Sequence, residues 1–347
     1  MAAKPKVFVT RRIPVAGLDR ILTACEAEVW PEQLPPPYEL ICAKAGTCDG
    51  LVTLLTDRID AALLDAAPRL KVVSNFAVGF NNIDIAAATE RGIAVGNTPG
   101  VLTDATADLA FALLIAAARR IVDGVDYGRA SHWKTWEPLG HLGQDLVGRT
   151  LGIVGMGRIG YALAKRCRGG WDMNVLYHDV NRNAKAEADL GARPADLDTL
   201  LRQADFISVH TDLNDTTRGL FNAATFAKMK RTAVFVNTAR GPIVVEADLI
   251  AALMAGTIFA AGLDVTDPEP PLPGSPLYQV PNLVVVPHIA SATTGTRNAM
   301  AEICANNLLA GLAGQDLPAW VNPEVKAKRL RIRHCGGPDQ GSQRMRG

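Results

Sequence analysis

The sequence predicts an α/β protein with two doubly wound domains, each built on a parallel sheet. Short apolar runs alternate with stretches of helical length and composition along most of the 347 residues. Runs such as Leu151–Val154 and Val284–Val286 are apolar on both faces, as expected for strands covered by helices on two sides. The composition, 48% hydrophobic but only 5% aromatic, is also typical of helices packed on parallel sheets.

The expected strands fall into two groups. The first group precedes residue 100 and comprises Lys6–Thr10, Ala27–Trp30, Gly50–Leu55, Lys71–Phe76 and Ile93–Val95. The second group comprises Thr150–Val154, Asn174–His178, Phe206–His210, Ala233–Asn237, Ala260–Asp264 and Leu283–Val286. Helical patterns at Ile159–Arg168, Ala195–Gln203 and Glu246–Ala255 separate strands of the second group, as in successive β-α-β units.

The segments between the two groups indicate the domain boundaries. Thr98-Pro99-Gly100 ends the first group, and Thr103–Arg120 reads as a connecting helix that Thr103 caps, with Thr106 in its first turn. A later helical stretch, Thr296–Ala313, carries no glycine-rich motif and is expected to return to the first domain. We therefore expect a split outer domain, 1–100 plus 291–325, with a second domain inserted at 101–290.

Composition excludes several classes of function. The net charge of +1 gives no field that would attract nucleic acid, a membrane surface or a polyanion. No apolar signal core precedes the first strand, and no apolar run approaches the ~20 residues of a membrane helix, so a soluble cytoplasmic protein is expected. The six cysteines form no CxxC pair, and no ligands stand at metal spacing. Residues 326–347 read as a basic, disordered tail.

A glycine-rich loop predicts a dinucleotide site in the inserted domain. Gly155, Gly157 and Gly160 form a GxGxxG pattern between an apolar strand and a helical stretch. In this context the first glycine permits a tight turn, the second lets backbone N–H groups approach a pyrophosphate, and the third lets the helix pack on the strand. The phosphates then lie at a helix N-terminus, which favours anions.

The next strand ends at an acidic residue, Asp179, about 20 residues after the loop, where a carboxylate can accept hydrogen bonds from ribose hydroxyls. It would also repel the 2′-phosphate of NADP, and Val180 adds no positive charge. The positive charge of Arg182 could reduce this repulsion and so weaken the preference for NAD. We therefore expect NAD, with NADP possible.

Three further residues follow strands of the same sheet at the edge where open α/β sheets bind ligands: Arg240, Glu269 and His288. Taken alone, each could have a purely structural role. Arg240 could form an ion pair, Glu269 could be a solvated loop carboxylate, and His288 could be a hydrogen-bonded structural histidine. Together they suit reduction of a carbonyl group. Arginine clamps a carboxylate and polarises the carbonyl oxygen, histidine donates a proton to that oxygen, and a nearby glutamate favours the imidazolium form.

Three motifs resemble the signatures of the D-isomer-specific 2-hydroxyacid dehydrogenases, with the likeness extending over about residues 5–320. They are Asn237-Thr-Ala-Arg-Gly241, Gly262-Leu-Asp-Val-Thr-Asp-Pro-Glu-Pro270 and Pro287-His-Ile-Ala-Ser-Ala292. Within that family the chain looks most like glyoxylate/hydroxypyruvate reductases. The resemblance implies a flavodoxin-like split substrate domain and a Rossmann domain. It also implies that Arg240 binds substrate, that His288 is the acid/base and that Glu269 is the carboxylate paired with His288.

The resemblance implies further binding residues. The substrate carboxylate would bind the backbone N–H groups of Val78 and Gly79, with Arg240 and His288 also contacting the substrate. Beyond the three glycines and Asp179, the cofactor contacts carried over are Thr106, Arg158, Ile159, His210, Thr211, Thr216, Thr238, Ala239, Arg240, Asp264, His288 and Ala290. On sequence grounds a hydrogen-bonded loop histidine is an equal alternative for His210, and a turn cap is the alternative for Asp264.

These assignments predict a hydride transfer from NAD(P)H to a small 2-keto acid, with His288 protonating the carbonyl oxygen. The alternatives are a D-lactate or D-3-phosphoglycerate type of dehydrogenase and a non-enzymatic NADH-sensing protein like the corepressors that share this fold. The segment Asn75–Phe80 offers no second cationic side chain for a phosphorylated substrate. The resemblance also implies a homodimer, with Phe111, Leu113, Leu114 and Ile115 of the connecting helix as the expected contact.

Overall fold

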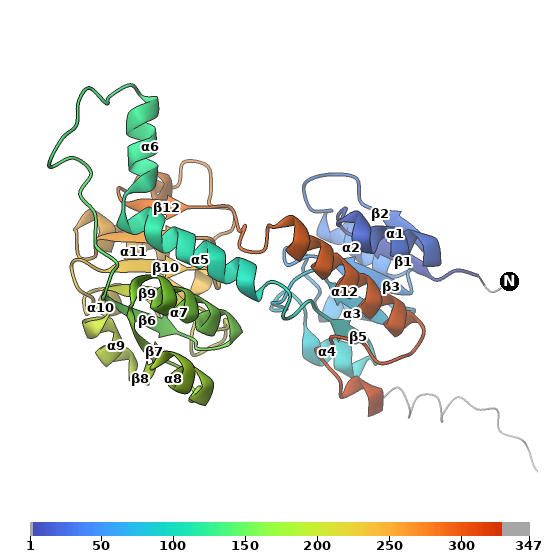
Figure 1. The fold of residues 1–347 in the computed structure, drawn as a ribbon. Coiled ribbons are helices and arrows are strands. Elements are labelled where there is room, and N and C mark those ends of the chain that lie inside the picture. The colour runs from blue at the N-terminus through green and yellow to red at the C-terminus, as the bar shows by residue number, and fades with distance from the viewer. Residues whose placement is uncertain (1–2, 328–347) are drawn as a thin grey trace, which may run out of the picture. The chain divides into compact units, whose positions relative to one another are not determined.

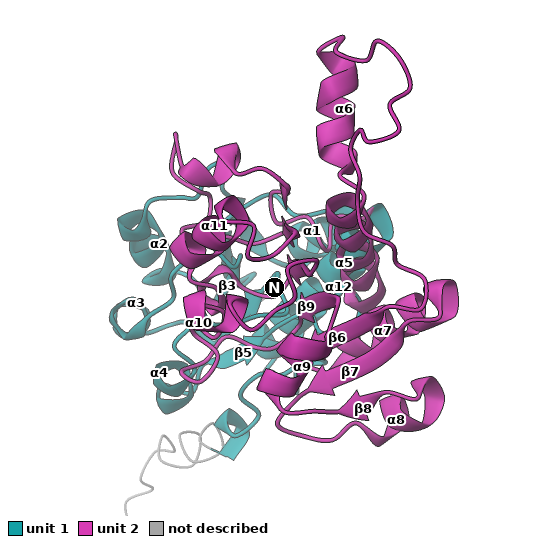
Figure 2. Cartoon of the chain, turned by 90° about the vertical axis from the view of Figure 1, so that its left-hand side faces the viewer, with its two compact units in different colours: residues 1–101, 294–347 teal, residues 102–293 magenta. Residues whose placement is uncertain are grey.

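The computed structural model describes residues 3–327 and comprises two compact units (Figures 1 and 2). Unit 1 contains residues 1–101 and the chain from residue 294, and unit 2 contains residues 102–293. Each unit has one sheet in which all strand pairs are parallel. This arrangement confirms the predicted fold class. The tail expected from residue 326 lies outside the described residues from residue 328 on.

The sheet of unit 1 has the strand order β2-β1-β3-β4-β5. Its strands are β1 (Lys6–Val9), β2 (Glu26–Val29), β3 (Gly50–Thr53), β4 (Val72–Asn75) and β5 (Ala94–Gly96). Its helices are α1 (Val15–Ala24), α2 (Tyr38–Ala45), α3 (Ala61–Asp65), α4 (Ile85–Glu90) and α12 (Thr294–Leu312). Helices α2, α3 and α4 pack on one face, against Leu51 and Val73. Helix α12 packs on the other face, where a Cβ at Gly311 would lie 2.5 Å from Val72.

The sheet of unit 2 has the strand order β12-β11-β10-β9-β6-β7-β8. Its strands are β6 (Thr150–Val154), β7 (Asn174–His178), β8 (Arg193–Pro194), β9 (Phe206–Val209), β10 (Val234–Asn237), β11 (Ala260–Leu263) and β12 (Leu283–Val285). Its helices are α5 (Thr103–Ala118), α6 (Ile121–Arg129), α7 (Arg158–Trp171), α8 (Ala184–Leu190), α9 (Leu197–Gln203), α10 (Ala223–Phe226) and α11 (Glu246–Met254), with 3-10 turns at Gly241–Ile243 and Pro276–Gln279. The order of strands reverses between β6 and β9, where such sheets bind dinucleotides.

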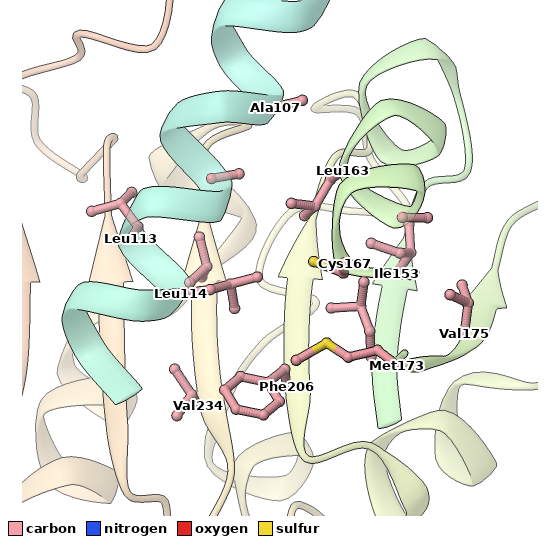
Figure 3. Packing of buried hydrophobic residues seen from close by; sticks show 14 of the residues in the cluster. Ala107, Leu113, Leu114, Ile153, Leu163, Cys167, Met173, Val175, Phe206 and Val234 are labelled. Atoms are coloured by element: carbon pink, nitrogen blue, oxygen red, sulfur yellow. The ribbon is translucent and has the colours of Figure 1, made fainter. Parts of the chain in front are cut away.

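Two hydrophobic cores cover the two faces of this sheet. On one face, α5 and α7 pack on residues such as Ile153, Val175 and Phe206 (Figure 3). On the other face, α9, α10 and α11 pack on the residues that alternate with them, such as Val154 and Leu176. Because successive side chains in a strand point to opposite faces, strands buried on both sides must be apolar throughout. This explains the apolar runs from which the strands were predicted.

Several boundaries differ from the expected ones. Thr103 does not cap the connecting helix, because α5 begins at Thr103 itself and the backbone N–H of Thr106 bonds Leu102 O. The helix ends at Ala118, since Arg120 takes a left-handed backbone conformation with φ of 51°. The next helix, α6, was not predicted. None of its residues is buried, and it contains two glycines, Gly124 and Gly128, which disfavour a helix. No helix within residues 3–327 is long and apolar enough to cross a membrane.

Candidate active site

The glycine loop follows β6 and begins α7, and its three glycines do different things. Gly155 has φ of +95°, and a Cβ there would lie 2.6 Å from the backbone N of Thr211. A Cβ at Gly160 would lie 2.3 Å from Gly155 O. A Cβ at Gly157, by contrast, meets nothing within 4 Å. The outer glycines are therefore required by packing within the protein, whereas Gly157 borders open space.

The residues at this loop fit a dinucleotide pyrophosphate. Helix α7 starts after Gly157 without a side-chain cap. Within residues 3–327, no acceptor is found for the backbone N–H groups of Arg158 and Ile159, the first two residues of the helix. Free N–H groups at a helix N-terminus, together with the helix dipole, favour an anion. The loop can therefore hold the phosphates through its backbone alone.

Asp179 lies directly after β7, beside the glycine loop. Its carboxylate accepts hydrogen bonds from the backbone N–H groups of Met156 (2.7 Å) and Asn181 (3.0 Å), one on each oxygen. Each carboxylate oxygen can accept a further bond, so the group remains able to bind ribose hydroxyls. Arg182 forms two hydrogen bonds to Glu187, at 3.0 and 2.5 Å. Its charge is therefore engaged by a carboxylate within the same loop and helix.

The other predicted cofactor residues of unit 2 lie along the same edge of the sheet or at the start of α5. His210 directly follows β9, and its Nε2 lies 2.9 Å from Ser208 Oγ. Burial lowers its pKa to about 3, so the ring is neutral. Thr211 follows it, and Thr216 sits in an exposed turn bonded to Asn214. Thr106 is buried, and the Thr238 hydroxyl is a buried group without a hydrogen-bond partner within residues 3–327. An unpartnered buried hydroxyl of this kind suits a ligand contact.

Arg240 is fixed by the turn that follows β10. The fully buried Asn237 accepts a hydrogen bond from Ala239 N (2.9 Å) and donates one to Arg240 O (2.9 Å). A Cβ at Gly241 would lie 1.8 Å from Thr266 O, so this turn is pressed against the segment that leads to Glu269. Burial lowers the pKa of the Arg240 guanidinium, while the charges of Glu269 and Asp212 act in the opposite direction. The side chain stays cationic at neutral pH.

Glu269 and His288 form a direct pair. Glu269 Oε1 lies 2.5 Å from His288 Nδ1, and about a third of the glutamate side chain and a quarter of the histidine side chain are exposed, at 33% and 23%. The partners come from the loops that follow β11 and β12, neighbouring strands of one parallel sheet. Since the carboxylate occupies Nδ1, the nitrogen left to face a substrate is Nε2.

Asp264 holds the loop that carries His288. Its carboxylate accepts hydrogen bonds from the backbone N–H groups of Ile289 (2.6 Å) and Ala290 (3.0 Å), and its own carbonyl accepts one from His288 N (2.9 Å). Burial raises the pKa of this carboxyl group. His288 itself has φ of 52°, a strained conformation for a non-glycine residue, which these bonds maintain. Asp264 and Ala290 were predicted as cofactor contacts, with a turn cap as the alternative for Asp264, and the bonds between Asp264 and the loop of His288 were not predicted.

The structure therefore brings Arg240, Glu269 and His288 to one edge of the unit 2 sheet, together with the glycine loop. Asn237 was also missed as a functional residue, although an asparagine just before a turn, in the motif that carries Arg240, is a recognisable signal. In unit 1, Val78 and Gly79 lie in the loop after β4. They are half-buried, and their backbone N–H groups have no acceptor within residues 3–327.

Comparison with known proteins identifies the family. The model of the NAD binding domain of the D-isomer specific 2-hydroxyacid dehydrogenases matches residues 111–290. The chain belongs to this family. It is therefore an NAD(P)-dependent oxidoreductase that acts on 2-hydroxy or 2-keto acids, as the sequence predicted.

Individual relatives match this chain over nearly its whole length. A glyoxylate reductase from Korarchaeum cryptofilum is 49% identical over 93% of this chain and 97% of its own length. Another from Thermococcus litoralis is 48% identical, covering 93% and 98%. Among solved structures, a protein from Thermus thermophilus has a TM-score of 0.86 at 47% identity, covering 91% of this chain and 99% of its own. An NADPH-dependent glyoxylate/hydroxypyruvate reductase from Sinorhizobium meliloti, in complex with NADP and malonate, has a TM-score of 0.80 at 31% identity, covering 93% and 98%.

Proposed function

We propose that this chain is a glyoxylate reductase that uses NADH to reduce glyoxylate and related small 2-keto acids to 2-hydroxy acids. The observation that carries the proposal is the pair of Glu269 and His288, placed with Arg240 at the ligand-binding edge of the dinucleotide domain. Relatives named glyoxylate reductase, 45–49% identical to this chain, support the choice of substrate.

Arg240 binds the substrate and polarises its carbonyl group in this proposal. A guanidinium presents donors in a planar fork that matches a carboxylate. The backbone N–H groups of Val78 and Gly79 add two more donors for the substrate carboxylate. Asn237 and Gly241 keep the arginine in place, since the first bonds both sides of its turn and the second permits close packing against Thr266.

His288 supplies the proton. The bound reduced nicotinamide supplies a hydride to the carbonyl carbon. The carbonyl oxygen then needs one proton to become a hydroxyl, and His288 Nε2 donates it because Nδ1 is held by Glu269. Glu269 orients the ring through the 2.5 Å contact with Nδ1. In the reverse direction the same nitrogen accepts the proton.

We assign NADH rather than NADPH as the preferred cofactor. Asp179 places a carboxylate where the ribose hydroxyls bind, and a 2′-phosphate there would meet a negative charge. Arg182 is the nearby cation that could offset this repulsion, but Glu187 engages it through two hydrogen bonds. The NADP complex of the Sinorhizobium relative shows that members of the same family can bind the phosphorylated form.

A homodimer is also part of the proposal. Of the four residues expected at its contact, Leu113 and Leu114 are buried in the core of their own unit and cannot contact a partner, whereas Phe111 and Ile115 are half-buried. Eight exposed large apolar side chains lie on residues 121–147, here called the arm, which consists of α6 and the loop after it. Helix α6 and the loop next to it stand away from the rest of unit 2 (Figures 1 and 2), whereas Leu146, near the end of the arm, is buried in the core.

Initial rates with glyoxylate, hydroxypyruvate and pyruvate, each with NADH and with NADPH, test the proposed activity. We expect glyoxylate with NADH to give the highest kcat/KM, and NADPH to be at least about tenfold poorer, equivalent to about 1.4 kcal/mol. Absence of reduction with all three acids would overturn the proposed function. A preference for NADPH would overturn only the assignment of Asp179 and Arg182.

A further inference from the structure

The loop after β4 has its carbonyl groups turned into unit 1. Ala77 O accepts a hydrogen bond from the backbone N–H of Thr98 (2.9 Å), and Val78 O accepts one from Asn97 Nδ2 (2.7 Å). Gly79 O accepts a third from Asn75 Nδ2 (2.9 Å). Three successive peptide groups are therefore anchored through their oxygens.

This anchoring fixes the direction of the N–H groups. In a trans peptide the C=O and N–H bonds point in opposite directions. The oxygens of Ala77 and Val78 both face the segment Asn97–Thr98, so the N–H groups of Val78 and Gly79 both face away from it. Neither has an acceptor within residues 3–327, and both residues are only half-buried. Two adjacent N–H groups that point the same way can bind the two oxygens of one carboxylate.

Asn97 is itself held on both sides. Its backbone N–H donates to Ala319 O (3.3 Å), and its carbonyl accepts a hydrogen bond from Nδ2 of the fully buried Asn307 in α12 (2.9 Å). A Cβ at Gly96 would lie 2.8 Å from the Asn307 side chain, so the strand end and the helix are in close contact. Because its backbone is pinned to α12 and to Ala319, the Asn97 amide has a defined position from which to bind Val78 O.

Asn75 closes the other end of the loop. It is fully buried, its Oδ1 accepts from Thr53 Oγ1 (3.0 Å), and its Nδ2 donates to Gly79 O and to Asn82 Oδ1 (3.3 Å). Asn82 in turn donates to Leu54 O and Asp57 O, at 3.0 and 2.9 Å. Side-chain amides that are bonded on every side are poorly placed to swing away, so the loop is preorganised before any ligand arrives.

We propose that Asn97 is a positioning residue for substrate recognition, because its amide, together with the backbone of Thr98, turns the N–H groups of Val78 and Gly79 outward as a carboxylate cradle. The inference rests on the proposed function, which supplies the 2-keto acid as ligand. It concerns binding of the carboxylate and not the hydride or proton transfer. Its signature is therefore a change in KM without an equal change in kcat.

The test compares Asn97→Ala with Asn322→Ala. Asn322 is another fully buried asparagine of unit 1, which bonds Val95 N and Ile93 O but does not contact the loop. We expect Asn97→Ala to raise the KM for glyoxylate, and the Kd for the unreactive analogue oxamate, by about tenfold, the loss of about one hydrogen bond. The KM for NADH and kcat should stay within about twofold. Asn322→Ala should lower the Tm but leave both constants for the carboxylates unchanged.

Either of two results would overturn the inference: a folded Asn97→Ala enzyme with unchanged oxamate affinity, or an equal loss of affinity in Asn322→Ala. Asn97→Asp provides a second variant if the alanine variant does not fold. It keeps the shape but replaces the donor by an acceptor, and it should weaken oxamate binding at least as much. Calorimetric titration of oxamate into the enzyme saturated with NADH needs no turnover. An enzyme whose oxamate affinity depends on Asn97 but which reduces no keto acid would uphold this inference and refute the proposed function.

Discussion

His288 combines a strained backbone with a ring fixed by a carboxylate. Asp264 holds the adjacent backbone N–H groups, and Glu269 holds Nδ1. Together these contacts leave few positions for the imidazole, and Nε2 is the ring nitrogen left available to a substrate. At the scale of single residues, the site is therefore built by side chains that orient other groups as much as by those that would touch substrate.

Replacing His288 by alanine should remove the proton donor. We expect kcat to fall by about 10²–10⁴-fold, the usual contribution of general acid catalysis. NADH affinity, measured by fluorescence titration, should change little, because the glycine loop and Asp179 are untouched. Glu269→Gln keeps an acceptor for Nδ1–H but loses the charge, so its kcat should lie between those of the wild type and His288→Ala. Near-wild-type turnover in His288→Ala would refute the assignment.

His210 should make stability depend on pH. Its pKa is about 3 in the folded protein, against an ordinary value of 6.5, because burial disfavours the charged ring. Between these two values the unfolded chain binds more protons than the folded one, so acidification below about pH 6.5 favours unfolding. His210→Gln has no such group, and its Tm should fall less between pH 7 and pH 5 than that of the wild type. An equal fall in both proteins would show that His210 titrates normally.

At the scale of secondary structure, the join between β6 and α7 supplies both packing and cofactor binding. The backbone of Gly160 lies against Gly155, and that of Gly155 lies against His210 and Thr211. These contacts set the angle at which α7 leaves the strand. As a result, the free N–H groups of Arg158 and Ile159 lie at the carboxyl edge of the sheet, next to Asp179.

Two alanine substitutions separate these roles. Gly160→Ala puts a Cβ 2.3 Å from Gly155 O, and we expect it to destabilise the fold by about 1–3 kcal/mol, although alanine normally favours a helix. Gly157→Ala meets no protein atom, so its Tm should be unchanged. It should nevertheless weaken NADH binding by about tenfold or more, because the Cβ occupies the approach of the pyrophosphate. Thermal melts and NADH titrations measure both effects, and unchanged NADH affinity in Gly157→Ala would contradict the proposed site.

At the scale of the whole molecule, packing within a single chain does not explain the exposed apolar side chains of the arm. Within it, Trp133, Trp136 and Leu139 have exposed fractions of 74%, 80% and 80%, and α6 buries no residue. Large exposed apolar side chains clustered in one projecting segment are typical of an interface. A second copy of the chain is the partner that the proposal assigns to it.

Trp136→Ser should therefore weaken self-association. We expect the wild type to elute as a dimer, and the variant to shift toward monomer with a dimer Kd raised by about 30-fold or more, equivalent to about 2 kcal/mol for a buried aromatic anchor. Leu34→Ser is the matched control, because Leu34 is 75% exposed but lies in unit 1. Sedimentation over a range of concentrations gives the Kd. A monomeric wild type, or an equal shift in Leu34→Ser, would count against the arm as the interface.

Patterns along the chain predicted every strand of the two sheets except β8 (Arg193–Pro194), a two-residue strand at the edge of its sheet, and they predicted where the catalytic candidates lie. Strands buried on both faces are apolar throughout, so they can be recognised in the sequence. The three glycines can be recognised as well, because each position has its own steric requirement. Arg240, Glu269 and His288 stand after such strands, and parallel strands bring their carboxyl ends to one edge. The sequence could therefore predict which side chains meet at this edge.

Only the tertiary structure decided how those side chains are held. Nothing in the local pattern shows that Asn97 bonds Val78 O, that Asn307 bonds Asn97 O, or that Asp264 bonds Ala290 N. These contacts join residues far apart in the chain and depend on the packing of strands and helices. Helix α6 escaped prediction for a different reason, since it buries no residue in its own chain and contains two glycines. Local sequence thus determined the chemistry that is present, whereas long-range packing determined its orientation.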